Sequence, residues 1–350
     1  MKRNNLIILT GGGSGGPVTP LLALADDLRA GGFDIAWIGT RAGIEKQIVS
    51  EAAIPYHSIA AGKFRRYFSW HNIIDPFKIL VGFFQSISLL TTLGPRLVIT
   101  AGAFVSVPVV WAAWALRIKV IVHQEDIRPG LANRLMAPCA DVVTVTFEES
   151  LKDYGNKARW TGNPVRQEFR NAAQHEPQPY DVPRVLILGG GTGATGINNL
   201  VAESLEELIK FCSITHICGQ REGALIVSKE RYTLRAFLNA ADMAQEMKAA
   251  DLVITRAGLA TLTELSYLAK PAIIIPMPNS HQEDNAAYFE KKGAALVLQQ
   301  SLLSSSMFID SIKNMLTNAG ARQLLSSGIK AIMKSDAQDA MMKIINEFIG

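Results

Sequence analysis

The chain has 350 residues, of which 48% are hydrophobic and 19% charged, and its formal net charge is +4. This length exceeds the usual size of one domain, so two domains with ample apolar cores are expected. The small net charge does not favour a nucleic-acid-binding protein. The three cysteines form no CxxC pair or zinc-type cluster, so we expect reduced thiols in a cytoplasmic protein with no metal site.

Apolar runs alternate with helix-type segments through the first half of the chain. The first run ends in a glycine-dense turn, Thr10 to Pro17, which we call the first glycine turn. Strands are predicted at 6–10, 34–38, 97–100, 119–122 and 142–145, and helices near 18–30, 43–52, 72–92, 108–116 and 130–136. The strands are rich in Val and Ile without polar alternation, which is typical of parallel sheets covered on both faces.

One apolar stretch, Leu97 to Leu116, is long enough to cross a membrane. Gly102 and Pro108 interrupt it, and its pattern favours a buried strand, a loop and a helix. The basic residues Lys2 and Arg3 precede only a short apolar run that ends in glycines, so no signal peptide is expected.

The second half repeats the alternation. Residues 171–184 contain three prolines and no periodicity, and are predicted to be a linker. Strands are predicted at 184–188, 214–217, 251–254, 272–275 and 295–298, and helices near 195–209, 240–248, 260–268, 283–291, 308–317 and 319–326. The strand at 184–188 leads into Gly189 to Ala194, the second glycine turn. Such turns bring backbone N–H groups and a helix start to one point, where a phosphate can dock.

Five segments resemble, in order and approximate spacing, the MurG family, the peptidoglycan N-acetylglucosaminyltransferases of glycosyltransferase family 28. They are Gly12–Gly16 with Val18 and Pro20, Gly162–Arg166, Gly189–Ala194, Arg256–Glu264, and His281–Ala286. The resemblance covers nearly the whole chain. It implies the α/β GT-B fold, in which two Rossmann-like, doubly wound parallel-sheet domains flank a cleft. Residues 1–164 would bind the acceptor and the membrane, and residues 165–350 the UDP-sugar, with helix 336–349 packing back on the first domain.

The resemblance also implies an activity. The family transfers N-acetylglucosamine with inversion from UDP-GlcNAc to lipid I, a lipid-linked muramyl acceptor, giving lipid II at the cytoplasmic face of the inner membrane. No cofactor, metal or nucleic acid is expected. The alternatives are a GT-B transferase with another lipid-linked or small acceptor, a nonhydrolysing UDP-sugar epimerase, and a catalytically silent UDP-sugar-binding scaffold in cell-wall assembly.

Donor-binding residues follow from the resemblance. Glu264 would hold the ribose hydroxyls, Arg166 the nucleotide, and His281 with Gln282 the sugar hydroxyls. The other donor-side positions are Gly191, Thr192, Gly193, Leu238, Gly258, Leu259, Ala260 and Thr261. The alternatives are a helix-dipole partner for Glu264, an interdomain salt bridge for Arg166, and a solvated N-cap cluster for the His281 loop.

The acceptor side departs from the family pattern. Pro17 stands where the family usually has a histidine, and the glycine loop at Gly102 is diluted. The family run His-Glu-Gln-Asn corresponds to His123-Gln124-Glu125-Asp126. An inverting transfer needs a general base, and the candidates are His123, Glu125 and Asp126; alternatively, these residues only cap the helix near Pro129. Ser14, Gly15, Gly16 and Asn163 complete the predicted substrate-binding residues.

A basic and aromatic segment, Lys63 to Trp70, continues into the apolar run Pro76 to Phe84. This composition is typical of an interfacial membrane contact, which the family resemblance also implies. The alternative is a buried helix beside a basic loop.

Overall fold

The computed structural model describes residues 5–13, 15–62, 71–177, 180–189, 193–219 and 228–349, without the side chains of residues 71–74 and 76. Ser14, Gly191, Thr192 and the basic segment Lys63 to Trp70 therefore lie outside the described residues. The chain divides into two compact units. Met1–Pro164 and Lys334–Gly350 form the first unit, and Val165–Met333 form the second unit.

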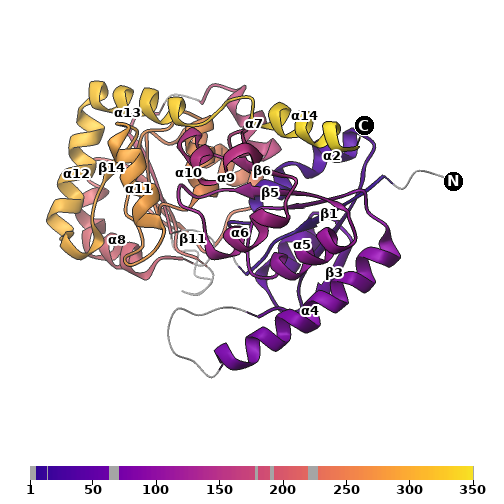
Figure 1. Ribbon diagram of the computed structural model, residues 1–350. Coiled ribbons are helices and arrows are strands. Elements are labelled where there is room, and N and C mark those ends of the chain that lie inside the picture. Colours follow the sequence, from indigo (N-terminus) through magenta and orange to yellow (C-terminus); the bar gives the residue numbers. More distant parts are fainter. Residues whose placement is uncertain are drawn as a thin grey trace. The chain divides into compact units, whose positions relative to one another are not determined.

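The first unit alternates strands and helices in the order typical of a doubly wound fold (Figure 1). Its strands are β1 (Leu6–Thr10), β2 (Asp34–Thr40), β3 (Tyr56–Ile59), β4 (Leu97–Thr100), β5 (Lys119–Gln124), β6 (Val142–Val145) and β7 (Ala158–Trp160). Its helices are α1 (Thr19–Ala23), α2 (Ala25–Ala30), α3 (Ile44–Glu51), α4 (His71–Leu93), α5 (Ser106–Ala115), α6 (Leu131–Met136) and α14 (Ala337–Ile349), with 3-10 turns η1 (Ala137–Cys139), η2 (Glu148–Asp153) and η3 (Gly155–Lys157).

The strand order of the first sheet is β3-β2-β1-β4-β5-β6-β7, and the described pairs are all parallel. The order reverses between β1 and β4, so the loops after these strands diverge to opposite faces. Ligands of doubly wound folds bind at this switch point, outside the carboxyl ends of the strands. The first glycine turn follows β1 and Gly102 follows β4, which places both at the switch point.

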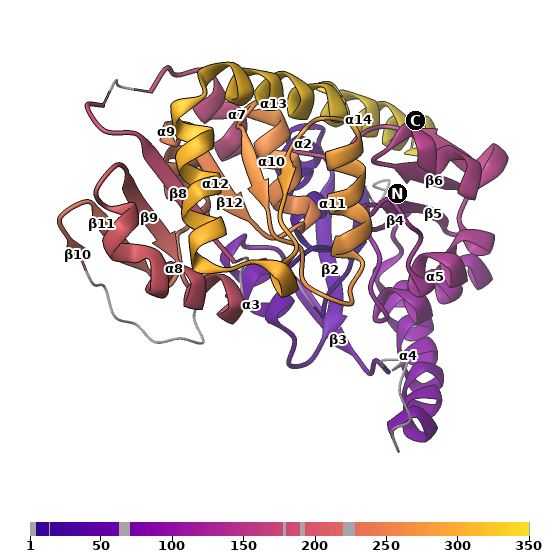
Figure 2. The ribbon, with the colours of Figure 1, turned by 90° about the vertical axis from the view of Figure 1, so that its left-hand side faces the viewer.

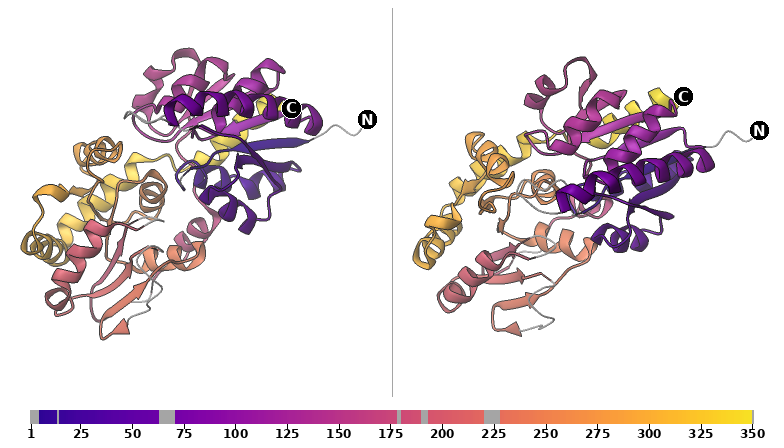
Figure 3. Two further views of the ribbon diagram at one scale, coloured as in Figure 1. Left: turned by 90° about the horizontal axis from the view of Figure 1, so that it is seen from below. Right: turned by 60° about the horizontal axis from the view of Figure 1, so that its bottom comes forward.

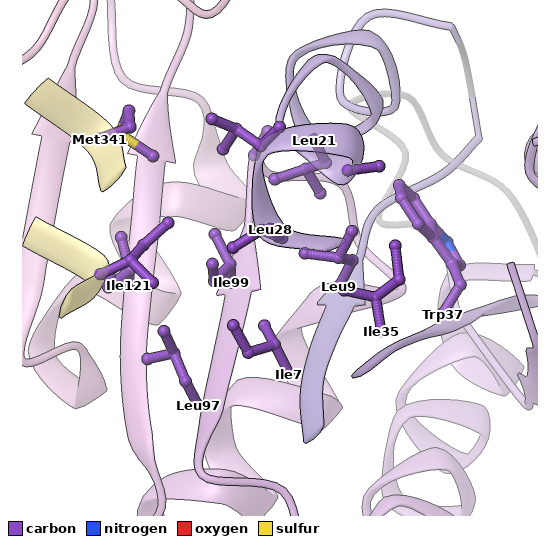
Figure 4. Packing of buried hydrophobic residues seen from close by; sticks show 14 of the residues in the cluster. Ile7, Leu9, Leu21, Leu28, Ile35, Trp37, Leu97, Ile99, Ile121 and Met341 are labelled. Carbon is purple, nitrogen blue, oxygen red and sulfur yellow. The ribbon is translucent and has the colours of Figure 1, made fainter. Parts of the chain in front are cut away.

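The core of the first unit includes a segment from the far end of the sequence. Ile7, Ile99 and Ile121 from the sheet and Leu28 from α2 are fully buried in one cluster with Met341 of α14 (Figure 4). Gln338 of α14 also donates from Nε2 to the carbonyl of Ala23 at 2.8 Å. The C-terminal helix is therefore an integral part of the first unit, although the intervening residues belong to the second.

The second unit has the same type of sheet (Figure 2). Its strands are β8 (Arg184–Leu188), β9 (Ser213–Ile217), β10 (Ser228–Lys229), β11 (Tyr232–Arg235), β12 (Leu252–Thr255), β13 (Ala272–Ile274) and β14 (Leu296–Val297). Its helices are α7 (Gln167–Ala173), α8 (Thr195–Leu208), α9 (Ala240–Ala249), α10 (Leu259–Tyr267), α11 (Gln282–Lys291), α12 (Ser305–Thr317) and α13 (Ala319–Ile332), with the 3-10 turn η5 (Gln300–Leu302).

The strand order of the second sheet is β10-β11-β9-β8-β12-β13-β14, parallel except for the edge strand β10. One face packs Ile187 and Ile254 against Ile197 of α8 and Phe308 of α12. The alternate residues, such as Leu186, are equally buried, because side chains of a strand point to the two faces in turn. Helices cover both faces of each sheet, as Figure 3 shows, which confirms the predicted pair of doubly wound domains.

The linker prediction is wrong. Residues 171–184 lie wholly inside the second unit, and the first connection between the units falls at Pro164 and Val165. Helix α7 begins directly after this connection and continues into the proline-containing stretch. Pro183 directly precedes β8, and no boundary between the two units falls in this stretch.

The long apolar stretch forms β4, a loop and α5, as expected. No helix in the described part of the chain is long and apolar enough to cross a membrane.

Candidate active site

In the second unit, the neighbouring strands β8 and β12 flank the switch point of the sheet, and the loops that follow them begin there. The described part of the second glycine turn is tightly packed. A side chain at Gly189 would place its Cβ 2.5 Å from the backbone nitrogen of Ala194, and one at Gly193 would lie 2.3 Å from the carbonyl oxygen of Cys218. Gly193 also has a φ of +81°, a conformation that glycine adopts without strain. The turn therefore brings its backbone close to the neighbouring loop.

A buried hydrogen-bond network supports this turn. Asn198 of α8 donates to the carbonyl of Cys218 at 2.9 Å, and its Oδ1 lies 3.0 Å from Nε2 of His216. Nδ1 of His216 lies 3.0 Å from the hydroxyl of Tyr232. These residues are not predictable from the sequence, because nothing in the local pattern links an Asn in a helix to a His in the next strand.

Helix α10 begins at Leu259, directly after the β12 turn, and no side chain caps its amino terminus. The N-cap residue, Gly258, leaves open space where a side chain would be. Leu259 packs inward, whereas Ala260 and Thr261 are partly exposed. The first backbone N–H groups of the helix are therefore available to a ligand and lie at its positive end.

Arg166 and Glu264 form an ion pair within the second unit. Nε of Arg166 donates to Oε1 of Glu264 at 2.8 Å, and Nη2 lies 2.6 Å from the same oxygen. The Glu264 side chain is only 5% exposed. Burial raises its pKa, while the guanidinium of Arg166 acts in the opposite direction. The alternative of a salt bridge between domains does not apply, since both residues belong to one unit.

Arg256 anchors the loop that leads to His281. Its Nη1 donates to the carbonyls of Ile275 and Pro276, each at 3.0 Å, and its Nη2 donates to Oε1 of Gln300 at 2.6 Å. Gln282, the first residue of α11, accepts from the backbone N–H of Met277 at 3.0 Å. These contacts fold the loop back at the carboxyl ends of β12 and β13.

His281 is exposed and is the N-cap residue of α11, but its side chain makes no capping bond. Asn285 is buried and donates to the carbonyl of Ala257 at 3.2 Å, so it ties α11 to the β12 turn. Leu238 lies partly buried in the loop after β11, at the same edge of the sheet.

In the first unit, the carboxyl ends of β5 and β6 and the loop after β7 bring a second group of polar residues together. His123 is buried, with Nε2 3.0 Å from Oδ1 of Asn163 and Nδ1 2.9 Å from the hydroxyl of Thr144. Burial lowers the pKa of His123 to about 4. The neutral ring donates from Nε2 and accepts at Nδ1, so both ring nitrogens are occupied inside the protein.

Glu125 lies beside this pair. Asn163 also hydrogen-bonds Glu125, while Oε1 of Glu125 is buried and accepts no hydrogen bond from the described residues. Burial, with a contribution from the charge of Asp126, raises the pKa of Glu125 well above its usual value. A buried acceptor without a partner is rare and marks a candidate functional group.

Asp126 is partly exposed, and its backbone carbonyl accepts from Nε2 of Gln124 at 2.7 Å. Neither carboxylate caps the following helix, because α6 begins at Leu131 after Gly130 with no side-chain cap. The capping alternative for these residues is therefore wrong.

The two sides of the first glycine turn differ in how closely they are packed. Gly11 accepts from Nε1 of Trp37 at 3.1 Å, and a Cβ at Gly11 would lie 2.7 Å from the carbonyl oxygen of Pro17. At Gly13 and Gly15 a Cβ would meet nothing within 4 Å. Gly16 is partly buried between Gly15 and Pro17. The turn is thus packed on one side and open on the other.

Among the described residues, no group of three or more His, Cys, Asp or Glu side chains could hold a metal ion.

Comparison with known proteins identifies the family. The glycosyltransferase family 28 N-terminal domain matches residues 7–145, and the glycosyltransferase family 28 C-terminal domain matches residues 184–343. The chain is 41% identical over 350 residues to a UDP-N-acetylglucosamine–N-acetylmuramyl-(pentapeptide) pyrophosphoryl-undecaprenol N-acetylglucosamine transferase from Clostridium kluyveri, covering 97% of this chain and 98% of the relative. A protein of the same name from Lachnoclostridium phytofermentans is 37% identical, covering 99% and 98%.

Among solved structures, MurG of Acinetobacter baumannii matches with a TM-score of 0.74 and 24% identity, covering 98% of this chain and 99% of that one. This likeness supports the two-sheet fold. Because two domain models match most of the chain and its relatives match it over nearly its full length, it belongs to glycosyltransferase family 28 and, within that family, to the MurG group.

Proposed function

We propose that this chain transfers N-acetylglucosamine from UDP-GlcNAc to lipid I with inversion at the anomeric carbon, giving lipid II. The relatives are named for this transfer. The structural observation that carries the proposal is the Arg166–Glu264 pair beside the uncapped amino terminus of α10. On one edge of the second sheet, the helix amino terminus offers N–H donors for a diphosphate, and Glu264 offers an acceptor for ribose hydroxyls.

The donor diphosphate would lie at the start of α10. The backbone N–H groups of Leu259, Ala260 and Thr261 offer hydrogen bonds at the positive end of the helix. Both guanidinium contacts of Arg166 go to Oε1 of Glu264, so Oε2 remains for the ribose hydroxyls. Negative charge that develops on the departing UDP would be stabilised by these same N–H groups.

The donor sugar would lie against the His281 loop. The side chains of His281 and Gln282 can donate to and accept from sugar hydroxyls. Arg256 holds the carbonyls of Ile275 and Pro276, and thereby fixes the direction in which this loop leaves β13.

We assign the general base to Glu125. In the transfer, the acceptor hydroxyl oxygen attacks the anomeric carbon while the bond from that carbon to the diphosphate oxygen breaks. The hydroxyl proton passes to the carboxylate. A raised pKa makes the ionised carboxylate a stronger base, and Oε1 has no competing hydrogen bond among the described residues.

His123 fits a positioning role better than the role of base. It is 1% exposed, and both of its ring nitrogens are occupied. Its hydrogen bond to Oδ1 fixes the orientation of the Asn163 side-chain amide, and this amide in turn hydrogen-bonds Glu125. Asp126 is the second candidate base, because it is more exposed than Glu125 and lies directly beside it.

The lipid-linked acceptor implies contact with the cytoplasmic membrane surface, and α4 offers a suitable face. Phe77, Leu80, Val81 and Phe84 are 69%, 54%, 50% and 62% exposed. Their spacing places them on one side of the helix. The helix lies along the outside of the first unit, and its amino-terminal half extends beyond the sheet (Figures 1 and 2). We propose that this half of α4 inserts into the membrane interface.

A panel of donors and acceptors, followed by UDP release, tests the proposal. UDP release that requires both UDP-GlcNAc and a lipid I analogue supports it. Release with a different lipid-linked acceptor would indicate another GT-B transferase, and conversion of UDP-GlcNAc to its C2 epimer without acceptor would indicate an epimerase. Donor binding without turnover on any acceptor would indicate a silent scaffold.

A further inference from the structure

Glu45 is a buried carboxylate beside the first glycine turn, and the site described above gives it no role. It lies in the first turn of α3 and is completely shielded from solvent. Oε2 accepts from the backbone N–H of Gly13 at 3.0 Å, and Oε1 accepts from the backbone N–H of Thr40 at 2.9 Å and from the Thr40 hydroxyl. These three groups are donors, and the Tyr56 side chain also hydrogen-bonds the carboxylate, so both of its oxygens are used.

The residues around Glu45 leave space for its side chain, but not for further side chains at the neighbouring glycines. A Cβ at Gly12 would lie 2.5 Å from Cδ of Glu45, and a Cβ at Gly43 would lie 1.9 Å from Oε2. Tyr56 donates to the carbonyl of Thr40 at 2.6 Å. Burial, followed by the charge of Glu45, raises the pKa of Tyr56, which keeps the phenol a neutral donor. The carboxylate thus occupies a specific pocket between the glycine turn and β2.

Hydrogen bonds compensate the buried charge. Within the described residues, no Lys or Arg pairs with Glu45. An ionised carboxylate out of water is costly unless charge-assisted hydrogen bonds satisfy it. The bond to Gly13 is the one that reaches the switch point, because Thr40 belongs to the neighbouring strand β2.

The bond to Gly13 fixes the orientation of the turn. Gly13 has a φ of +79°, and its N–H points to Glu45. On the preceding side, Trp37 holds the carbonyl of Gly11. Both ends of this tripeptide are therefore held from the packed side, while a side chain at Gly13 or Gly15 would meet open space.

We infer that Glu45 is a positioning residue for the acceptor: it holds the first glycine turn so that the open side can receive the acceptor phosphates. This inference rests on the proposal that the first unit binds a lipid-linked acceptor. Glu45 acts through the backbone of Gly13 and does not touch the substrate.

Glu45→Gln tests the inference, with Glu51→Gln as a matched control. Glu51 lies on the same helix but is exposed. In Glu45→Gln the amide nitrogen must face one of the donors, so the KM for the lipid I analogue rises about 10- to 100-fold. The KM for UDP-GlcNAc and kcat stay within about twofold of wild type. Glu51→Gln leaves all three constants unchanged.

Hydrogen exchange of peptides that span residues 11–18 gives a readout independent of turnover. The Gly13 amide should exchange faster in Glu45→Gln than in Glu51→Gln. If Glu45→Gln does not fold, Thr40→Val removes one donor and should raise the acceptor KM by a smaller factor. A folded Glu45→Gln protein with wild-type acceptor KM, or with unchanged exchange at Gly13, overturns the inference. If wild type uses no lipid-linked acceptor, the proposed function fails, while exchange still decides whether Glu45 holds the turn.

Discussion

Arg166 places Nε at 2.8 Å and Nη2 at 2.6 Å from a single oxygen, Oε1, of the buried carboxylate of Glu264. The guanidinium also lies over the ring of Phe169, 4.8 Å from its centroid. The pair fixes the direction of both side chains at the edge of the second sheet. It compensates the buried charge of Glu264, and neither of the two contacts involves the other carboxylate oxygen, Oε2.

Glu264→Gln should weaken donor binding. The amide is a poorer acceptor for ribose hydroxyls and no longer pairs with Arg166, so the KM for UDP-GlcNAc rises about 10- to 100-fold. Steady-state kinetics with the acceptor saturating give this constant. Glu283→Gln, an exposed change in the first turn of α11, is the control. Equal donor KM values for the two variants would remove Glu264 from the nucleotide site.

Glu125→Gln should reduce kcat by about 10²- to 10⁴-fold, because the amide cannot accept the acceptor proton. KM values should change little, since the side chain keeps its size. Asp126→Asn is the comparison and should retain most activity. If Glu125→Gln is active and Asp126→Asn is not, the base is Asp126.

The pH profile of wild-type kcat provides a second check on Glu125. The base must be ionised, and burial raises its pKa above the usual 4.5. Activity should therefore fall, as the pH is lowered, at a midpoint above 4.5. Asn163→Ala removes a hydrogen bond that lowers this pKa, so the midpoint should move to still higher pH. An acid limb at or below 4.5 would contradict the assignment.

Glu125→Gln should also stabilise the protein at alkaline pH. Because the folded-state pKa of Glu125 is raised, the folded state binds more protons than the unfolded state between the two pKa values. Wild type therefore loses stability as the pH rises through this window, and the Gln variant does not. Thermal unfolding should show a higher Tm for Glu125→Gln at pH 8, with the difference shrinking toward pH 5. A variant that is less stable at every pH would argue against burial of an ionisable Glu125.

Charge on the exposed face of α4 should prevent membrane binding. The double variant Leu80→Glu with Phe84→Glu places two carboxylates on the apolar face, so it should no longer sediment with vesicles that contain anionic lipid. Its Tm should stay near that of wild type, since both positions are exposed. Leu324→Glu, at an exposed position of α13, should bind vesicles normally. Loss of binding in both proteins would point to net charge and not to this face.

The strands that the sequence predicted are those with continuous Val and Ile runs, such as β1, β4 and β12. They are buried on both faces, so hydrophobic burial alone determines their composition. The strands that were missed lie at or next to sheet edges. β3 (Tyr56–Ile59) and β7 (Ala158–Trp160) end the first sheet, and β10 with β11 ends the second. Their polar side chains are partly exposed, so these strands lack the continuous apolar run by which the other strands were predicted.

The candidate site also contains some features that the local sequence predicts and others that it does not. Turn positions such as Gly258 follow predictably from their strands, because a strand, a glycine and a helix start determine the local geometry. Glu45 and the His123–Asn163 contact are different. Gly13 and Glu45 are 32 residues apart, and His123 and Asn163 are 40 apart. Only the parallel strand order brings such residues to one edge, so local sequence patterns contain no sign of these contacts.

The most direct measurement is transfer of radiolabelled N-acetylglucosamine from UDP-GlcNAc to a lipid I analogue by the wild-type protein, with Glu125→Gln beside it. We predict that the label appears in the lipid-linked product with wild type, in proportion to UDP released, and is nearly absent with the variant. Labelled UDP-GlcNAc that is bound but never transferred to the lipid, or equal transfer by both proteins, would contradict the account.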